Sequence, residues 1–262
     1  MKVTTLGLFI LLTLSCCKVK ETSLDKTNSE STDFNILSET FLKNIKEGKS
    51  TTEIQDKIAK TTIEALDNAL IDDAHRYAFW INIYNAYIQV VLKDQPELYD
   101  DRRNFFSSEQ LRIAGQNVSF ETIEHGILRK SQWSLGLGYI RKWLPGKFER
   151  KLRVDKRDYR IHFALNCGAT DCPPVAIYTP ERIEKQFEKG TKTYLERTSD
   201  YDPTNKTISV TSLFSWFRGD FGGKSGTKDI LKTQGIIKSA DDVEIEYSDY
   251  DWTLDLDNFI DL

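Results

Sequence analysis

The 262-residue sequence predicts an α+β fold, in which a mostly helical single domain with a small β-sheet spans about residues 34–262. Three observations predict this class. Several long segments repeat apolar side chains with helical spacing. Short apolar segments bounded by Gly, Pro, Asn or Asp are typical of strands. The chain has no internal repeat, and its length suits one large domain.

The first helices are predicted from apolar periodicity. Asn35–Lys46 and Glu53–Leu70 both place apolar residues three or four positions apart, which lines one face of a helix. In the second segment these residues are Ile54, Ile58, Ile63, Leu66 and Leu70.

The next helix, Ala74–Lys93, differs because large apolar side chains surround it on every side. We therefore expect it to be central and buried. The pair Asp72–Asp73 is a suitable N-cap, and Pro96 follows the end of the helix.

The middle of the chain is predicted to mix elements. Leu111–Ala114 and Asn117–Ser119 flank Gly115 as a short hairpin. A helix then runs from Ser119 or Glu121 to about Lys130. The segment Gln132–Gly146, with scattered Gly and Pro, is expected to be irregular and exposed.

Tyr159–Asn166 is predicted to be a buried strand, because it has apolar residues on both faces. Further elements follow toward the C-terminus. They are a helix over Pro180–Arg197, a strand over Thr207–Val210, a short helix over Leu213–Arg218, a glycine-rich loop over Phe221–Gly226 and a strand over Val243–Tyr247.

The first 33 residues are expected to lie outside the fold. Val3–Leu14 is almost continuously apolar but too short to span a bilayer, which takes ~20 residues. Residues 1–17 are therefore predicted to be a lipoprotein signal peptide, with Cys16 or Cys17 as the lipidated residue. Residues 18–33 are predicted to be a flexible tether. This places the domain in the cell envelope, lipid-anchored outside the cytoplasm.

Composition limits the partners. The formal net charge is −4, and no long basic run is present, which argues against a nucleic-acid partner. No cofactor is predicted. We expect a small-molecule or peptide ligand, and contact with the membrane through the N-terminal lipid.

The segment Ile161–Pro174 carries His162, Cys167 and Cys172 on one short passage from the predicted strand into a glycine-containing turn. Three interpretations remain open. Cys167 could be a nucleophile, with His162 or His125 as its base. The two cysteines and one or two histidines could ligate a metal, although the C-x4-C spacing is loose for zinc. Cys167 and Cys172 could also be structural, either as a disulfide or as two packed thiols.

Two further polar clusters are candidates. Asn82, Asn85 and Gln89 share one face of the central helix, where they either brace neighbouring backbone or line a polar cavity. His125 and Arg129 lie one helical turn apart, and Glu124 precedes His125. This group is either a surface ion-pair patch or part of a site.

Five motifs follow one another along the chain. They are AFWINIYNAY at Ala78–Tyr87, IEHGILR at Ile123–Arg129, RIHFALNCGATDCPP at Arg160–Pro174, LFSWFRGDF at Leu213–Phe221 and YDWTL at Tyr250–Leu254. Their order resembles the domain of unknown function 547 family. The resemblance runs from about residue 60 to the C-terminus, although Asp171 stands where the family pattern usually has Ser. It implies a secreted or lipoprotein setting. It also implies one cavity that gathers Asn82, Asn85, Glu124, His125, Arg129, His162, Cys167 and Cys172.

The resulting hypothesis is a thiol-dependent hydrolase or acyl transferase that acts on a peptide or amide-like substrate of the envelope. Cys167 would be the nucleophile, His162 the base, and Asn82 or Asn85 the orienting or oxyanion-binding amide. Substrate would be bound by Glu124, His125 and Arg129. The alternative is a non-catalytic module that binds a ligand or partner, with both cysteines structural.

Overall fold

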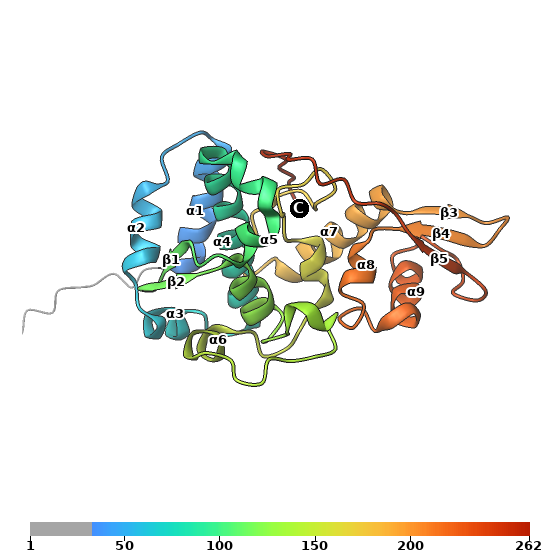
Figure 1. The fold of residues 1–262 in the computed structure, drawn as a ribbon, viewed down its shortest axis with the longest axis horizontal. Helices are drawn as coiled ribbons and strands as arrows, with labels where there is room; N and C mark the ends of the chain where they lie inside the picture. The colour runs from blue at the N-terminus through green and yellow to red at the C-terminus, as the bar shows by residue number, and fades with distance from the viewer. Residues whose placement is uncertain (1–32) are drawn as a thin grey trace, which may run out of the picture. The chain divides into compact units, whose positions relative to one another are not determined.

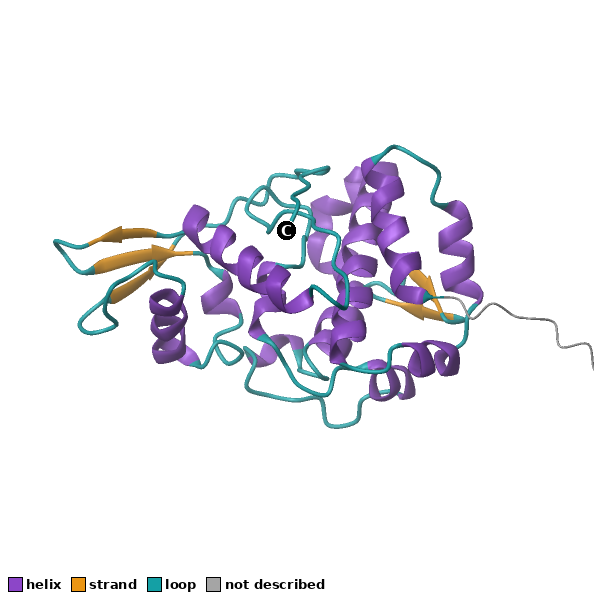
Figure 2. Cartoon of the chain, turned by 180° about the vertical axis from the view of Figure 1, so that it is seen from behind, coloured by secondary structure: helices purple, strands orange, loops and turns teal. Residues whose placement is uncertain are grey.

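The computed structural model describes residues 33–262, which form a mostly helical α+β domain with two small sheets, as predicted (Figures 1 and 2). The predicted signal peptide, and the predicted tether up to residue 32, lie outside the described residues. Asp33, the last tether residue, caps the first helix by accepting hydrogen bonds from the backbone of Asn35 and Ile36. Within the described part of the chain, no helix is both long and apolar enough to cross a bilayer.

The first helices are α1 (Phe34–Lys46), α2 (Thr52–Lys60) and α3 (Ile63–Ala69). The prediction of helix over Glu53–Leu70 is therefore wrong at its centre, where the chain is extended at Thr61 and Thr62. The hydroxyl of Thr62 accepts a hydrogen bond from the Ala65 backbone nitrogen at 3.1 Å. This N-cap satisfies a backbone donor at the start of α3 and allows a second helix to begin there.

The predicted central helix is confirmed as α4 (Asp73–Asp94). The carboxylate of Asp72 accepts a hydrogen bond from the His75 backbone nitrogen at 3.0 Å, which is the expected N-cap. Helix α4 contacts α1, α7 and η2, and most of its apolar side chains, including Trp80, are buried. Each large side chain buried in this way contributes roughly 1.5–3 kcal/mol to stability, so α4 is the main support of the domain.

The middle of the chain follows the prediction in outline. After α4 come η1 (Pro96–Asp101) and α5 (Arg102–Ser107). Strands β1 (Leu111–Ile113) and β2 (Gln116–Val118) then pair as the expected antiparallel hairpin. The helix expected before Lys130 is η2 (Thr122–Leu128), a π-helix. The irregular, exposed segment contains η3 (Ser134–Gly136) and leads to α6 (Lys147–Leu152).

The predicted strand over Tyr159–Asn166 is wrong. Tyr159–Phe163 forms a 3-10 helix, η4, which Asp158 caps by accepting from the Arg160 backbone nitrogen. Beyond it, the amide of Asn85 donates to the Ala164 carbonyl at 3.0 Å and accepts from the Asn166 backbone nitrogen at 2.8 Å. One side chain of α4 therefore supplies the hydrogen bonds that a neighbouring strand would have given. The strand prediction failed because a fully buried segment has apolar residues on both sides whether it is a strand or a helix.

The C-terminal part begins with α7 (Ile183–Thr198), the expected amphipathic helix. A three-stranded sheet follows, in which β4 (Thr207–Val210) pairs antiparallel with β3 (Asp200–Asp202) and parallel with β5 (Glu244–Tyr247). Helices α8 (Leu213–Trp216) and α9 (Gly223–Thr233) pack beside this sheet (Figure 1). The predicted glycine-rich loop is thus shorter than expected, because the turn at Gly222 and Gly223, both with positive φ, starts a helix.

The last residues form an extended C-terminal strap over residues 250–262 that returns from the sheet toward the helices (Figure 1). It forms isolated bridges between Leu254 and Ala169 and between Phe259 and Val175. These bridges hold the loop that carries Cys167 and Cys172 against the domain.

Candidate functional site

An apolar cavity of about 500 Å³ opens where η2, η4, α8 and the C-terminal strap meet. Its size is within the range of ~300–1,000 Å³ that is usual for small-molecule sites. The apolar part of its wall is built by Phe106, Leu135, Leu137, Leu165, Pro173, Leu213, Trp216, Phe217 and Trp252. The polar part is built by Tyr84, Arg103, Glu121, Glu124, His125, Ser134, His162 and Tyr250, and Cys167 also lines the cavity.

His125 enters the cavity wall from η2 as a neutral imidazole. Its Nδ1 lies 2.7 Å from Nη1 of Arg129. Because a guanidinium only donates, Nδ1 accepts and the proton is on Nε2. Burial, followed by the positive charge of Arg129, holds the pKa of His125 well below its usual value. His125 therefore offers an N–H donor from Nε2, which no group in the described part of the chain engages.

Glu124, beside it on the π-helix, is a carboxyl group in a poorly solvated setting. The Tyr84 hydroxyl donates to its Oε2 at 3.5 Å, and its Oε1 lies 3.6 Å from Nδ1 of His125. Burial raises the pKa of Glu124 to about 7, and the charge of Arg129 limits the rise. A carboxyl group with this pKa changes charge at neutral pH, which is a property of acid–base and binding sites.

Asp220 organises the charges behind these residues. Its Oδ2 accepts from Nε of Arg129 at 2.6 Å and from Nε2 of His162 at 2.9 Å, and its Oδ1 accepts from Nη1 of Arg157 at 2.8 Å. Burial alone would raise the pKa of Asp220, but the hydrogen bonds and charges of its partners lower it to about 2. Asp220 is therefore ionised and neutralises Arg129, whose side chain is 1% exposed.

His162 is neutral as well. Burial lowers its pKa to about 4, although the hydrogen bond to Asp220 acts in the opposite direction. Since Nε2 donates to the carboxylate, Nδ1 keeps a lone pair. The ring stacks on Phe217 with centroids 4.0 Å apart, which fixes its orientation in the cavity wall.

Close packing of two glycines positions Asp220. A Cβ on Gly219 would lie 2.6 Å from the carbonyl carbon of Gly138, and a Cβ on Gly138 would lie 2.7 Å from the Asp220 backbone nitrogen. Gly138 also has a φ of +87°. The backbone nitrogen of Gly219 donates to the Leu137 carbonyl at 2.8 Å. The loop before Asp220 is thus held directly against the segment that forms the cavity rim.

Cys167 and Cys172 form a disulfide, with an S–S distance of 2.02 Å. The hydroxyl of Tyr250 lies 3.4 Å from the Cys172 sulfur and 3.8 Å from the Cys167 sulfur. Of the three interpretations of the cysteines, the structural disulfide is therefore the one found in this structure. Neither sulfur is a thiolate here, so neither is free to attack a substrate or to ligate a metal.

Asn82 and Asn85 do not line the cavity, contrary to the prediction that they orient a substrate. Asn82 donates to the Ser38 hydroxyl and to the Tyr178 carbonyl, and accepts from the Tyr178 backbone nitrogen. Asn85 bonds the backbone beyond η4. Both amides are fully buried, and their role is to fix loops against α4. The bracing alternative is the correct one.

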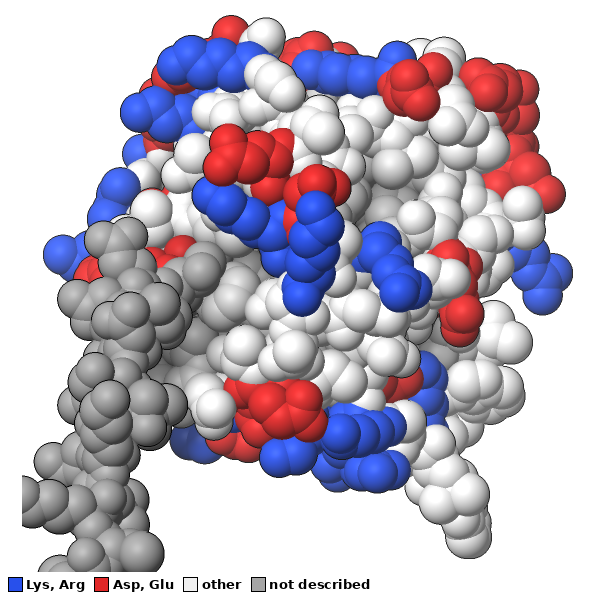
Figure 3. All heavy atoms as spheres, turned by 90° about the vertical axis from the view of Figure 1, so that its left-hand side faces the viewer, with Lys and Arg blue, Asp and Glu red and all other residues white. Residues whose placement is uncertain are grey.

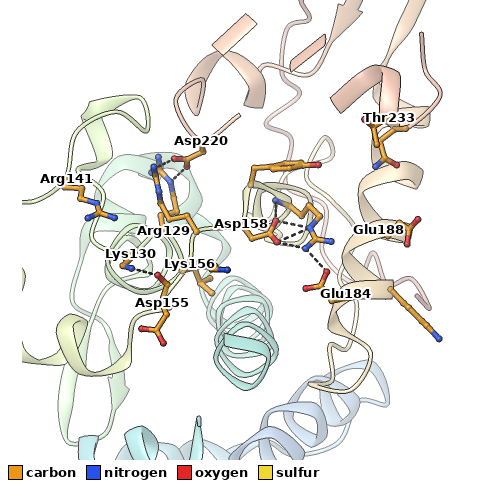
Figure 4. A pocket seen from close by; sticks show the side chains of 16 residues that line it. Arg129, Lys130, Arg141, Asp155, Lys156, Asp158, Glu184, Glu188, Asp220 and Thr233 are labelled. Carbon is orange, nitrogen blue, oxygen red and sulfur yellow. Dashed lines mark hydrogen bonds and ion pairs between the residues drawn. The ribbon is translucent and has the colours of Figure 1, made fainter. Parts of the chain in front are cut away.

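A second, charged cavity of about 890 Å³ lies on the other side of Arg129 and Asp220 (Figure 4). Several of its charged side chains have partners within the domain. Arg129 pairs with Asp220, and Arg160 pairs with Asp158 and Glu184. The Lys130 ammonium donates to the Asp155 carbonyl. Because these groups are already engaged, and because the apolar cavity can hold the apolar body of a ligand, the apolar cavity is the better candidate for a ligand site.

Residues 69–195 match the model of a family described as "Protein of unknown function, DUF547". This region of the chain is similar to the DUF547 family. Searches among curated proteins and among solved structures found no match. The last two motifs of the resemblance, after Leu213, lie beyond the matched region.

The DUF547 region supplies four of the predicted residues directly to the cavity wall, namely Glu124, His125, His162 and Cys167. Arg129 lies behind the wall, where its guanidinium donates a hydrogen bond to His125. The cavity therefore gathers only part of the predicted set, because Asn82, Asn85 and Cys172 are not among its lining residues.

Asp220, Tyr250 and Trp252 were missed as site residues, and all three follow the DUF547 region. Their signal was present in the sequence, since Asp220 lies in LFSWFRGDF and the other two lie in YDWTL. An acidic residue directly after a glycine, in a motif rich in aromatic residues, was the feature that could have identified Asp220.

Proposed function

We propose that the apolar cavity binds a small molecule with an apolar body and an amide-like polar end. The observation that carries this proposal is the pairing of Glu124 with His125 at one side of a largely apolar wall. Above pH 7 the ionised Glu124 accepts a hydrogen bond, and Nε2 of His125 donates one. An amide has both a donor and an acceptor, so it complements this pair. A carboxylate would be repelled by Glu124.

The first test compares dodecanamide with dodecanoate by isothermal titration at pH 8. The amide is expected to bind at least about tenfold more tightly, which corresponds to ~1.4 kcal/mol. Glu124→Gln should remove most of this preference, because it removes the repelling charge. Glu188→Gln, an exposed change in the charged cavity, should preserve it. If the wild-type protein binds neither compound, or prefers the carboxylate at pH 8, the proposal is wrong.

A second candidate is the thiol-dependent hydrolase or acyl transferase. The Cys167 sulfur and the His162 ring line the same cavity, which favours it. An external thiol reductant would first have to convert the disulfide to two thiols. The reduced Cys167 would then attack the amide carbonyl while His162 takes the thiol proton. The C–N bond would break, His162 would give that proton to the departing amine, and water or an acceptor amine would release the acyl group from the thioester.

An acyl p-nitroanilide tests this candidate, because cleavage releases coloured p-nitroaniline. Activity should require reductant, disappear in Cys167→Ser and persist in Cys172→Ser. If the double variant Cys167→Ser/Cys172→Ser binds dodecanamide normally and reductant produces no cleavage, the cysteines are structural. In that case the double variant should lose only about 2 kcal/mol of stability in urea unfolding, because the closed loop is short.

We also propose, from the N-terminal sequence, that the protein is an envelope lipoprotein acylated at Cys16 or Cys17. Mass spectrometry of the mature N-terminus would identify the modified residue, and an unmodified N-terminus that retains residues 1–17 would refute this.

A further inference from the structure

The segment 133–144 exposes most of its large apolar side chains. Trp143 is 92% exposed and Leu144 is 84% exposed. The other exposed members are Trp133, Leu135, Leu137, Tyr139 and Ile140. Elsewhere among residues 33–262 the exposed large hydrophobic residues are only Ile36, Ile71 and Tyr247. Isolated exposed apolar side chains are ordinary, but a contiguous group of them marks an interaction surface.

Positive charge surrounds this segment. Between residues 130 and 153 the chain has seven Lys and Arg residues and a single acidic residue, Glu149, although the whole chain has a net charge of −4. Three of these lysines pair with carboxylates, of Glu149, Glu64 and Asp67. In the described part of the chain, the remaining cations have neutral hydrogen-bond partners or none; they are Lys130, Arg141, Arg150 and Arg153.

The segment is folded rather than loose. The backbone nitrogen of Trp133 donates to the Ile140 carbonyl at 2.9 Å, and that of Lys142 donates to the Ser131 carbonyl at 2.8 Å. It precedes α6 along the lower edge of the domain in Figure 1. The space-filling view shows uncharged side chains projecting at the lower right, and Lys and Arg beside Asp and Glu along the lower edge (Figure 3). A preformed surface of this kind loses little conformational entropy when it binds.

We propose that the segment 133–144 docks on the surface of an anionic lipid bilayer. Trp and Tyr concentrate at membrane interfaces, and Lys or Arg near an anionic surface contributes ~1 kcal/mol each. Leu144 and Trp143 would enter the interface while Arg141 and its neighbours meet the headgroups. A second copy of the chain is a poorer occupant, because a two-fold interface would bring the same cations of both copies together.

The position of the segment also bears on the cavity. Ser134, Leu135 and Leu137 belong both to the segment and to the wall of the apolar cavity. A docked segment therefore places the cavity beside the lipid, so that an amphiphile can enter it from the bilayer. This last step rests on the proposed function, whereas docking itself does not.

Tryptophan quenching by lipids with brominated acyl chains tests the proposal in the full-length protein. All five tryptophans lie in the domain, so the N-terminal segment contributes no signal. Vesicles of phosphatidylcholine and phosphatidylglycerol should quench the wild-type fluorescence. The Trp133→Phe/Trp143→Phe variant should lose more than half of the quenching. Removing phosphatidylglycerol, or changing Arg141 to Glu, should reduce it by about twofold or more.

The controls separate the outcomes. Ile36→Ser/Ile71→Ser, which changes exposed apolar residues elsewhere, should be quenched like the wild type. Absence of quenching, or equal quenching after both tryptophans are replaced, would overturn docking. So would a dimer that forms without lipid and is lost in Trp143→Ser/Leu144→Ser. If Trp216→Phe/Trp252→Phe reduces the quenching, an acyl chain has entered the cavity. If this variant is quenched like the wild type, entry from the bilayer is refuted but docking is not.

Discussion

Replacement of Asp220 by Asn is expected to lower the free energy of unfolding by about 3–5 kcal/mol, the range for breaking a buried ion pair. Asp220 accepts hydrogen bonds from Arg129, His162 and Arg157, and its side chain is only 5% exposed. Without that charge, the buried guanidinium of Arg129 would lose its ion pair with residue 220, because an amide oxygen there is neutral, as is the ring of His125. Nη2 of Arg129 already has no partner among the described residues.

Urea unfolding at pH 8 measures this effect. Asp155→Asn is a matched control, because Asp155 is also an aspartate paired with an arginine, Arg76, but its side chain is 83% exposed. Exposed pairs contribute roughly 0–1 kcal/mol, so the control should remain close to the wild type. If Asp220→Asn loses no more stability than Asp155→Asn, Asp220 does not hold the charge network together.

The partners of Asp220 show why the sequence revealed only part of the site. Arg129 and His162 lie 91 and 58 residues before it along the chain. No local pattern specifies contacts over such separations. By contrast, the burial of α4 follows from apolar residues on all its faces, and the hairpin follows from Gly115 between two short apolar segments. Local periodicity predicts elements, and tertiary packing decides which polar residues meet.

The asparagines of α4 illustrate the same limit. Their spacing correctly places Asn82 and Asn85 on one face, but spacing is the same for a ligand-binding amide and a bracing amide. The structure distinguishes them, because Tyr178 and the backbone at Ala164–Asn166 occupy the hydrogen-bonding positions. The amide of Asn85 also explains why the segment after η4 needs no partner strand. The sequence of that segment has no periodic pattern that would reveal hydrogen bonds from a distant side chain instead of from a neighbouring strand.

The pH dependence of stability is expected to be set by opposing groups in the cavity wall. The folded-state pKa values of His125 and His162 are lowered. Their contributions to the free energy of unfolding are therefore complete above about pH 6.5 and are lost as the pH falls below that value. The folded-state pKa of Glu124 is raised from 4.5 to about 7. Its contribution is complete below pH 4.5 and is lost as the pH rises through 7. Between about pH 4.5 and 6.5, the stability lost at Glu124 as the pH rises therefore offsets the stability gained at one histidine.

Glu124→Gln removes that offset, and urea unfolding from pH 4.5 to 8.5 should reveal it. Each titrating group changes stability by ~1.4 kcal/mol per pH unit between its two pKa values. The stability of the variant relative to the wild type should thus rise by about 3 kcal/mol as the pH increases from 4.5 to 8. Glu188→Gln should give a curve parallel to the wild type, since Glu188 is exposed. A parallel curve for Glu124→Gln would instead mean that Glu124 is as well solvated as a surface carboxylate, and the amide-binding proposal would lose its charged acceptor.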